Sequence, residues 1–305
     1  GDLGTVIIDG NSPAFQSVTA TGGTYIVGNN INFNVTWDEA VVIGTGSNAP
    51  TLTLSNSATA SYTSGELTAT LIFTYTVAEN DTNSTNLLVT GYQGTIKDAA
   101  GNVADQCNSD SFQQGWIEVD ANPPLFSSVS ATDGSYFIGN TLEITVTWGD
   151  VVNITDTPTL TLSNSATASY TSGTGTTSLI FTYTVVEGDT DSSDLSVSSY
   201  SGTITDVNNN TAGAISNGDL GSVVIDGNSP TFVSVNATDD TYNVGNNLYI
   251  TVTWNKNVNV TGQPTLQLSN GATATYYSGA ATTDLVFRYI VADGDAGTTD
   301  LSVSS

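Results

Sequence analysis

The segment INFNVTW, from Ile31 to Trp37, alternates apolar and polar side chains along its length. It recurs as LEITVTW from Leu142 to Trp148 and as LYITVTW from Leu248 to Trp254. Alternation with a period of two is typical of a β-strand that buries one face and exposes the other. The chain therefore contains three copies of the same predicted strand, each ending at a tryptophan.

Other segments repeat at similar intervals. TLTLSN begins at Thr51 and recurs at Thr159, an offset of 108 residues, and TLQLSN follows at Thr265 after a further 106 residues. FTYTV, which begins at Phe73, recurs at Phe181, and the variant FRYIV follows at Phe287, at the same offsets. Self-similarity at a fixed period is typical of repeated structural units. Repeat 1 has extra residues between Trp37 and Thr51, and this insertion predicts a longer loop.

Within each repeat, clusters of Gly, Asn, Asp and Pro separate about seven or eight strand-like runs. This number of runs in roughly 106 residues favours an antiparallel β-sandwich with one face of each sheet buried. No run has a helical period of apolar residues. The predicted fold class is therefore all-β.

Short linkers of the form Asp-x-Asn-x-Pro separate the repeats. They are IDGNSP at 8–13, VDANPP at 119–124 and IDGNSP at 225–230. Proline fixes the backbone φ angle, so a linker of this kind is short and stiff. We predict a terminal strand of a preceding repeat at residues 1–10 and sandwich repeats at 11–120, 121–226 and 227–305, the last incomplete at its C-terminal strands.

The linkers, the DAAGN loop from Asp98 to Asn102 and the repeat length resemble the tandem bacterial immunoglobulin-like repeats of large cell-surface adhesins and extracellular filament proteins. The resemblance implies antiparallel sandwiches joined end to end, in a long protein at the cell surface or outside the cell. Antibody domains differ because they carry a cysteine pair that this chain lacks.

The charge is extreme for a chain of 305 residues. It has 29 Asp and Glu against 3 Lys and Arg, a formal net charge of −26 and no His. Nucleic acids and anionic membranes are predicted to be poor partners, because both need a cationic surface on the protein that binds them. Without histidine, most acid–base and transition-metal chemistry loses its main residue type. A non-enzymatic protein whose partners include cations is predicted.

Acidic and amide side chains recur at the linkers and at the loops expected beside them. The candidate metal ligands are Asp9, Asn11 and Asp98 at the first linker, Glu79, Asp81, Asp120, Asn122, Asp206 and Asn210 at the second, and Glu187, Asp189, Asp226 and Asn228 at the third. Asp150 and Asp133 are further contributors to the second and third sets.

An oxygen-only ligand set without His or Cys suits calcium, which takes 6 to 8 oxygen ligands, better than zinc or copper. We therefore predict structural calcium ions that stiffen the junctions. The alternative is that these residues are solvated and cap turns through hydrogen bonds to the backbone, as Asp and Asn commonly do.

Two further predictions concern sites of covalent modification. Asn-x-Ser/Thr sequons, which are potential glycosylation sites, begin at Asn34, Asn80, Asn83, Asn153, Asn209, Asn236 and Asn259. Cys107 is the single cysteine. It is interpreted as a free or packed thiol, with an intermolecular disulfide as the alternative.

The leading functional hypothesis is a calcium-stiffened rod or filament segment whose neighbours are further repeats or copies of itself. One alternative is a module of an adhesin that binds a glycan or another surface, for which repeat 1 is the candidate because of its insertion at 44–49, Trp116 and Cys107. A second alternative is a subunit that polymerises by head-to-tail strand donation, because GDLGTVIIDG at 1–10 matches GDLGSVVIDG at 218–227. A glycosidase with paired carboxylates ranks below these.

Overall fold

A computed structural model describes residues 1, 3–107 and 116–304 of the chain. The chain divides into two compact units. Unit 1 comprises Gly1–Val185 and Thr190–Asp226, and unit 2 comprises Val186–Asp189 and Gly227–Ser305. Unit 1 contains repeats 1 and 2, each with its own cluster of buried side chains, and unit 2 contains repeat 3.

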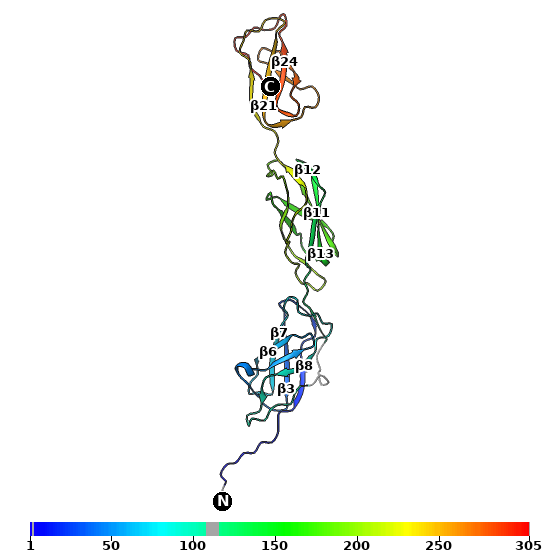
Figure 1. Cartoon of the computed structure of the whole chain (residues 1–305), viewed down its shortest axis with the longest axis vertical. Helices are drawn as coiled ribbons and strands as arrows, with labels where there is room; N and C mark the ends of the chain where they lie inside the picture. Colours follow the sequence, from blue (N-terminus) through cyan, green and yellow to red (C-terminus); the bar gives the residue numbers. More distant parts are fainter. Residues whose placement is uncertain (2, 108–115, 305) are drawn as a thin grey trace. The chain divides into compact units, whose positions relative to one another are not determined.

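The described residues of repeat 1 form ten strands and one short 3-10 turn, several of which are labelled in Figure 1. The elements are β1 (Phe15–Thr19), β2 (Gly23–Ile26), β3 (Asn30–Trp37), β4 (Val42–Ile43), η1 (Gly46–Asn48), β5 (Thr51–Leu54), β6 (Thr59–Ser64), β7 (Thr70–Thr76), β8 (Val89–Gln93), β9 (Ile96–Lys97) and β10 (Ile117–Asp120). The turn η1 lies in the predicted insertion, which is a loop as expected.

The strand order of repeat 1 is that of an immunoglobulin-like sandwich. The main sheet runs β1-β3-β7-β6-β5-β8, and β10 pairs in parallel with β2. An isolated antiparallel bridge between Ser84 and Val119 places β10 beside the segment that leads into β8. Strands β1, β3, β7 and β6 correspond to the A-B-E-D sheet of this fold, and β5, β8 and β10 correspond to its C-F-G sheet; pairing between β5 and β6 joins the two sheets at one edge. The prediction of antiparallel immunoglobulin-like sandwiches is confirmed.

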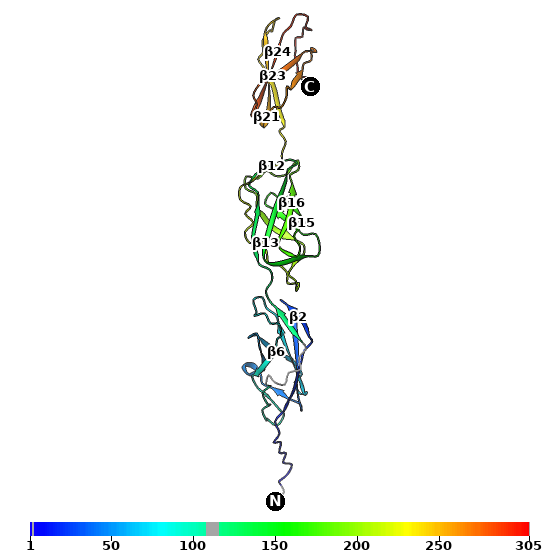
Figure 2. The same ribbon diagram turned by 90° about the vertical axis from the view of Figure 1, so that its right-hand side faces the viewer.

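Repeat 2 uses the same order, and Figure 2 shows its strands from the side. Its strands are β11 (Phe126–Ala131), β12 (Gly134–Phe137), β13 (Thr141–Ile154), β14 (Thr159–Leu162), β15 (Thr167–Ser172), β16 (Thr176–Thr184), β17 (Val197–Ser201), β18 (Ile204–Thr205) and β19 (Val223–Asp226). The terminal strand β19 pairs in parallel with β12. The two repeats of unit 1 are thus copies in topology as well as in sequence.

Repeat 3 has a five-stranded sheet in the order β20-β21-β24-β23-β22. Its strands are β20 (Phe232–Ala237), β21 (Asn247–Val258), β22 (Thr265–Gln267), β23 (Thr273–Ser278) and β24 (Thr282–Ile290). The described part of this repeat includes no strand that corresponds to β10 or β19. Its core is accordingly less shielded, with Val252 6% exposed where the corresponding Val35 of repeat 1 is fully buried.

The alternating segments form the cores as predicted. Ile31, Phe33 and Val35 of β3 are fully buried and Trp37 is 1% exposed, while Asn32 and Asn34 face solvent. Burying such side chains contributes about 1.5 to 3 kcal/mol each, which drives the two sheets together. In the described residues, no helix is long and apolar enough to cross a membrane.

Candidate functional site

The loop that follows β9 holds a buried carboxylate in a fixed position. Asp98 is 2% exposed. Its Oδ1 accepts hydrogen bonds from the backbone N–H groups of Gly101 at 2.6 Å and Asn102 at 2.8 Å, and its Oδ2 accepts one from Asn102 Nδ2 at 2.7 Å. Burial raises the pKa of Asp98, but the hydrogen bonds from Asn102, Gly101 and Ala100 outweigh burial and leave the pKa below its usual value. The group is therefore ionised at neutral pH.

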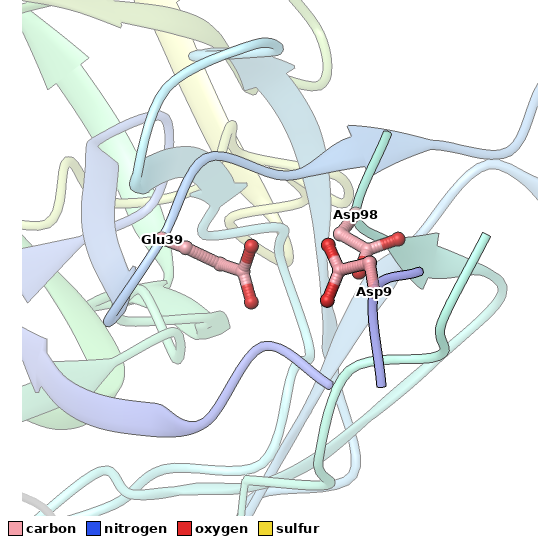
Figure 3. Close-up of side chains that lie close together, drawn as sticks. All are labelled: Asp9, Glu39 and Asp98. Carbon is pink, nitrogen blue, oxygen red and sulfur yellow. The ribbon is translucent and has the colours of Figure 1, made fainter. Parts of the chain in front are cut away.

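Two more carboxylates converge on Asp98. Asp9, Glu39 and Asp98 each offer an oxygen atom, and these atoms lie within 4.8 Å of one another. Figure 3 shows the three side chains pointing toward a common space. Within residues 1, 3–107 and 116–304, this is the only place where three such groups meet so closely. We call it the first-junction cluster.

Three different segments supply this cluster. Asp9 belongs to the linker, and its backbone carbonyl accepts a hydrogen bond from Asn102 Nδ2 at 3.3 Å. Glu39 lies two residues beyond Trp37, which closes β3. Burial and the negative charges of Asp98, Asp9 and Asp38 raise the pKa of Glu39. The nearby carboxylates of Asp98, Asp9 and Asp38 disfavour the negative charge of Glu39, so a cation placed among them would be favoured.

The prediction from sequence included Asp9 and Asp98 but missed Glu39. Aligning the three repeats could have pointed to Glu39. The residue two positions after the repeated tryptophan is charged in every copy, namely Glu39, Asp150 and Lys256. Strand pairing supports this equivalence, since Trp37, Trp148 and Trp254 each pair with a phenylalanine of the first strand. Asn11, the other predicted ligand here, donates its backbone N–H to Asp9 Oδ1 at 3.1 Å.

The second junction has a loop at 206–210 equivalent to the loop at 98–102, but different groups lie beside its linker carboxylate. Asp206 accepts hydrogen bonds from the N–H groups of Asn208 at 2.8 Å and Asn210 at 2.9 Å, and from Asn210 Nδ2 at 2.9 Å. Asn208 Nδ2 donates to Asp120 Oδ2 at 2.7 Å, and Asn83 Nδ2 donates to Asp120 Oδ1 at 3.0 Å. Amide groups thus stabilise the linker carboxylate of repeat 2.

One of those contacts depends on a side chain that repeat 1 lacks at the corresponding position. The position of Asn208 in the loop is held by Ala100 in repeat 1, which has no side-chain donor. Asp150, which corresponds to Glu39, is exposed in β13. Asn122 donates its N–H to Asp120 Oδ1 at 3.3 Å, so the second linker forms the same local turn as the first.

At the start of repeat 3, a lysine occupies the position of Glu39. Lys256 Nζ donates a hydrogen bond to the backbone carbonyl of Asn228 at 2.7 Å. Asn228 corresponds to Asn11 of the first linker. Repeat 3 therefore carries its own cation against its linker, where repeat 1 carries a carboxylate.

Other predicted ligands cap turns within their own loops. Asp81 Oδ2 accepts hydrogen bonds from Tyr75 Oη at 2.7 Å and from the Ala78 N–H at 2.8 Å. Burial and the bond to Asp81 raise the pKa of Tyr75 to about 12. Asp189 Oδ2 accepts from the Val186 N–H at 2.8 Å. These contacts fit the turn-capping interpretation of the acidic loops.

The remaining predicted ligands lie apart from any group of three carboxylates among the described residues. Glu79 is exposed. Glu187 accepts a hydrogen bond from the Ser229 N–H at 3.1 Å, and Asn228 Nδ2 donates to the Asp189 carbonyl at 3.2 Å. Asp133 accepts from the Ser222 N–H at 2.8 Å. Metal binding at these residues and at Asp226 stays a prediction.

The sequons and the cysteine take simple positions. The sequon asparagine that is half-buried is Asn153. The six exposed ones are Asn34, Asn80, Asn83, Asn209, Asn236 and Asn259. Cys107 is 3% exposed within the core of repeat 1, and burial raises the pKa of its thiol to about 11. This placement favours a packed thiol over a reactive one.

Comparisons with known proteins give a fold likeness alone. No protein-family model matches the chain, and no curated protein matches it by sequence. Solved structures do match, among them a crystal structure of the I9–I11 tandem from titin, at 9% sequence identity and a TM-score of 0.29. That match covers 94% of this chain and 97% of the titin chain. The chain is a tandem of immunoglobulin-like β-sandwiches on the basis of its own strand pairing.

Proposed function

We propose that this chain is a non-enzymatic spacer segment of an extracellular or cell-surface protein, in which a calcium ion stiffens the junction before repeat 1. The repetition of one sandwich with short proline-containing linkers is what a spacer requires. The resemblance to bacterial adhesin and filament repeats supports the cell-surface location. The single observation that carries the calcium proposal is the first-junction cluster of Asp9, Glu39 and Asp98.

Comparison of the three junctions within the chain supports a cation at the first. Repeat 3 places the ammonium group of Lys256 against its linker. Repeat 2 places the amide of Asn208 on the linker carboxylate of Asp120. Repeat 1 has Glu39 in place of the lysine and Ala100 in place of the amide. Its own side chains therefore offset the negative charge at its linker less than those of repeats 2 and 3 do. Carboxylate and carbonyl oxygens are the ligands that calcium prefers.

The proposed ion would tie the linker to the body of repeat 1. Asp9 comes from the linker, while Glu39 and Asp98 belong to two loops of the sandwich. Without a cation these carboxylates repel one another, and the linker is held by weaker contacts such as the Asn102 to Asp9 hydrogen bond. A bound ion would therefore restrict the motion of the linker.

Hydrogen exchange on the intact chain tests this proposal. We expect calcium to slow backbone amide exchange in residues 6–11 and 98–102, with little change in the equivalent loop of repeat 2 at 206–210. Titration calorimetry should report one strong site per chain. If exchange at both loops is the same in millimolar calcium as in excess chelator, the cluster is a set of solvated acidic residues and the calcium proposal is wrong.

A second candidate is strand donation between copies of the chain. Leu3, Val6, Ile7 and Ile8 are 84%, 60%, 85% and 90% exposed, although their segment matches the segment that ends in β19 of repeat 2. In repeat 3, a hollow of about 580 Å³ lies between the segment 235–242 and the segment 299–303. An apolar strand added at such an open edge would complete the sandwich.

Strand donation predicts self-association that depends on the apolar side chains of residues 3–8. Replacing Ile8 with Asp should abolish it, because Ile8 corresponds to Ile225, which is 1% exposed in β19, and the charge would be buried against the apolar side chains of the hollow, whereas replacing Thr5 with Ser should not. Analytical ultracentrifugation over a range of chain concentrations measures the effect. A monomer at every concentration for the unmodified chain would rule this candidate out and leave the spacer proposal standing.

A further inference from the structure

The outer face of one sheet differs chemically in repeat 3 alone. Tyr249 on β21 pairs across the sheet with Arg288 on β24, and Tyr277 occupies the bulge in β23 between Tyr276 and Ser278. Strand register gives the equivalent residues in the other copies. They are Asn32, Thr74 and Thr63 in repeat 1, and Glu143, Thr182 and Thr171 in repeat 2.

In repeat 3 these three side chains form what we call the Tyr–Arg patch. The ring centroids of Tyr249 and Tyr277 are 5.3 Å apart with an interplanar angle of 62°. The guanidinium carbon of Arg288 lies 5.3 Å from the centroid of the Tyr277 ring, a cation–π arrangement. The two tyrosines are 43% and 53% exposed. The patch is thus ordered by its own contacts while its rings remain accessible.

The corresponding face of repeat 1 satisfies its own polar groups. Thr63 and Thr74 share a hydrogen bond at 2.8 Å, and Thr74 donates to Asn32 Oδ1 at 2.7 Å. In the described part of repeat 3, the hydroxyl groups of Tyr249 and Tyr277 have no hydrogen-bond partner and Arg288 has no carboxylate partner. Such groups are available to a ligand.

A hollow of about 370 Å³ adjoins the patch. It is lined by Thr273, Thr275 and Ile290 beside Arg288, with Asp295 also on its wall. The carboxylate of Asp295 is already engaged, since it accepts hydrogen bonds from the Tyr289 hydroxyl and from the Ala292 N–H. The hollow has room for one sugar ring between hydroxyl groups and an apolar side chain.

We propose that the Tyr–Arg patch binds a terminal sugar that carries a single carboxylate. Tyrosine rings present an apolar face for the C–H face of a sugar and a hydroxyl for hydrogen bonding. The planar guanidinium of Arg288 matches a carboxylate with two parallel hydrogen bonds. The chain's net charge of −26 disfavours polyanions as occupants, because like charges repel over the whole surface.

The test uses methyl glucuronide and methyl glucoside, two probes with the same ring that differ at the carboxylate. NMR titration of the intact chain should show glucuronide binding about tenfold more tightly than glucoside, which corresponds to the gain from one charged pair. Arg288→Thr should remove this preference. Tyr277→Thr should weaken the binding of both probes. Both variants place in repeat 3 the residue that repeat 1 carries at the same position, so folding is expected to survive.

A reciprocal variant tests whether the three side chains suffice. Asn32→Tyr, Thr63→Tyr and Thr74→Arg together should add a second glucuronide site in repeat 1. Immobilised glycans with a terminal glucuronate should give the same ranking of variants as the free probe. Equal binding of the two probes, or binding unaffected by Arg288→Thr, would overturn the proposal. Loss of self-association in Arg288→Thr without loss of sugar binding would instead assign the patch to a second copy, and would also overturn it.

Discussion

Replacing Gly173 with alanine will destabilise repeat 2 more than any exchange between exposed residues of the same hairpin. Gly173 has φ +111°, and a Cβ atom there would lie 2.1 Å from the Ser178 carbonyl oxygen and 2.9 Å from the Leu179 Cα. Both are backbone atoms of β16, so neither can rotate away. A clash and an unfavourable backbone conformation together should cost about 3 kcal/mol or more.

A neighbouring glycine provides the matched control. Gly175 lies in the same turn with φ +78°, but a Cβ atom there would meet open space. Gly175→Ala should therefore cost only the left-handed backbone strain, about 1 to 2 kcal/mol. Calorimetry of the intact chain, with hydrogen exchange to assign the transition of repeat 2, distinguishes the two. Equal melting temperatures for the two variants would show that the close approach to the β16 backbone is not the reason for glycine at position 173.

The same glycine recurs in the other repeats. A Cβ atom at Gly65 would lie 2.1 Å from the Thr70 carbonyl oxygen, and one at Gly279 would lie 2.0 Å from that of Asp284. Alanine at either position should destabilise its own repeat by a similar amount. The three hairpins thus share one packing solution, in which the turn lies directly against the following strand.

Replacing Glu39 with lysine is expected to abolish the calcium response of the first junction. The variant removes one proposed ligand and introduces the side chain that repeat 3 uses at this position, where Lys256 donates to the Asn228 carbonyl. The lysine should hold the linker in the absence of calcium. Hydrogen exchange of residues 6–11 should then be slow with or without calcium, and titration calorimetry should show no strong site.

The control for this variant carries the same change in charge at another surface. Glu66 is exposed in the turn that follows β6, so Glu66→Lys should leave calcium affinity nearly unchanged. If Glu66→Lys weakens calcium binding as much as Glu39→Lys does, the effect comes from net charge rather than from the first-junction cluster. Full calcium binding by Glu39→Lys would exclude Glu39 as a ligand.

Much of the fold could be predicted from local patterns. Alternation along 31–37 predicted which side chains are buried, because successive side chains of a strand point to opposite faces. The turn-rich segments predicted the loops for the same local reason. The strand order was harder, since pairing between β10 and β2 joins residues about 90 positions apart. Only the size of the repeat and the resemblance to known repeats pointed to that arrangement.

The candidate site was predicted in part. Asp9 and Asp98 were identified because acidic residues recur at linkers, yet the same recurrence also suggested Asp81 and Asp189, which accept hydrogen bonds within their own turns. Composition cannot separate a turn cap from a metal ligand, because both functions use the same carboxylate. The distinction depends on which oxygen atoms face one another.

By itself, the sequence determined the three repeats, their β-strands, their linkers and the strong negative charge. Each follows from periodicity or composition, which involve residues near one another in the chain. The tertiary structure decided that Glu39 joins Asp9 and Asp98, and that Tyr249, Tyr277 and Arg288 share one face. Those groupings come from strands and loops far apart in the chain, and sheet register and loop packing alone bring such residues together.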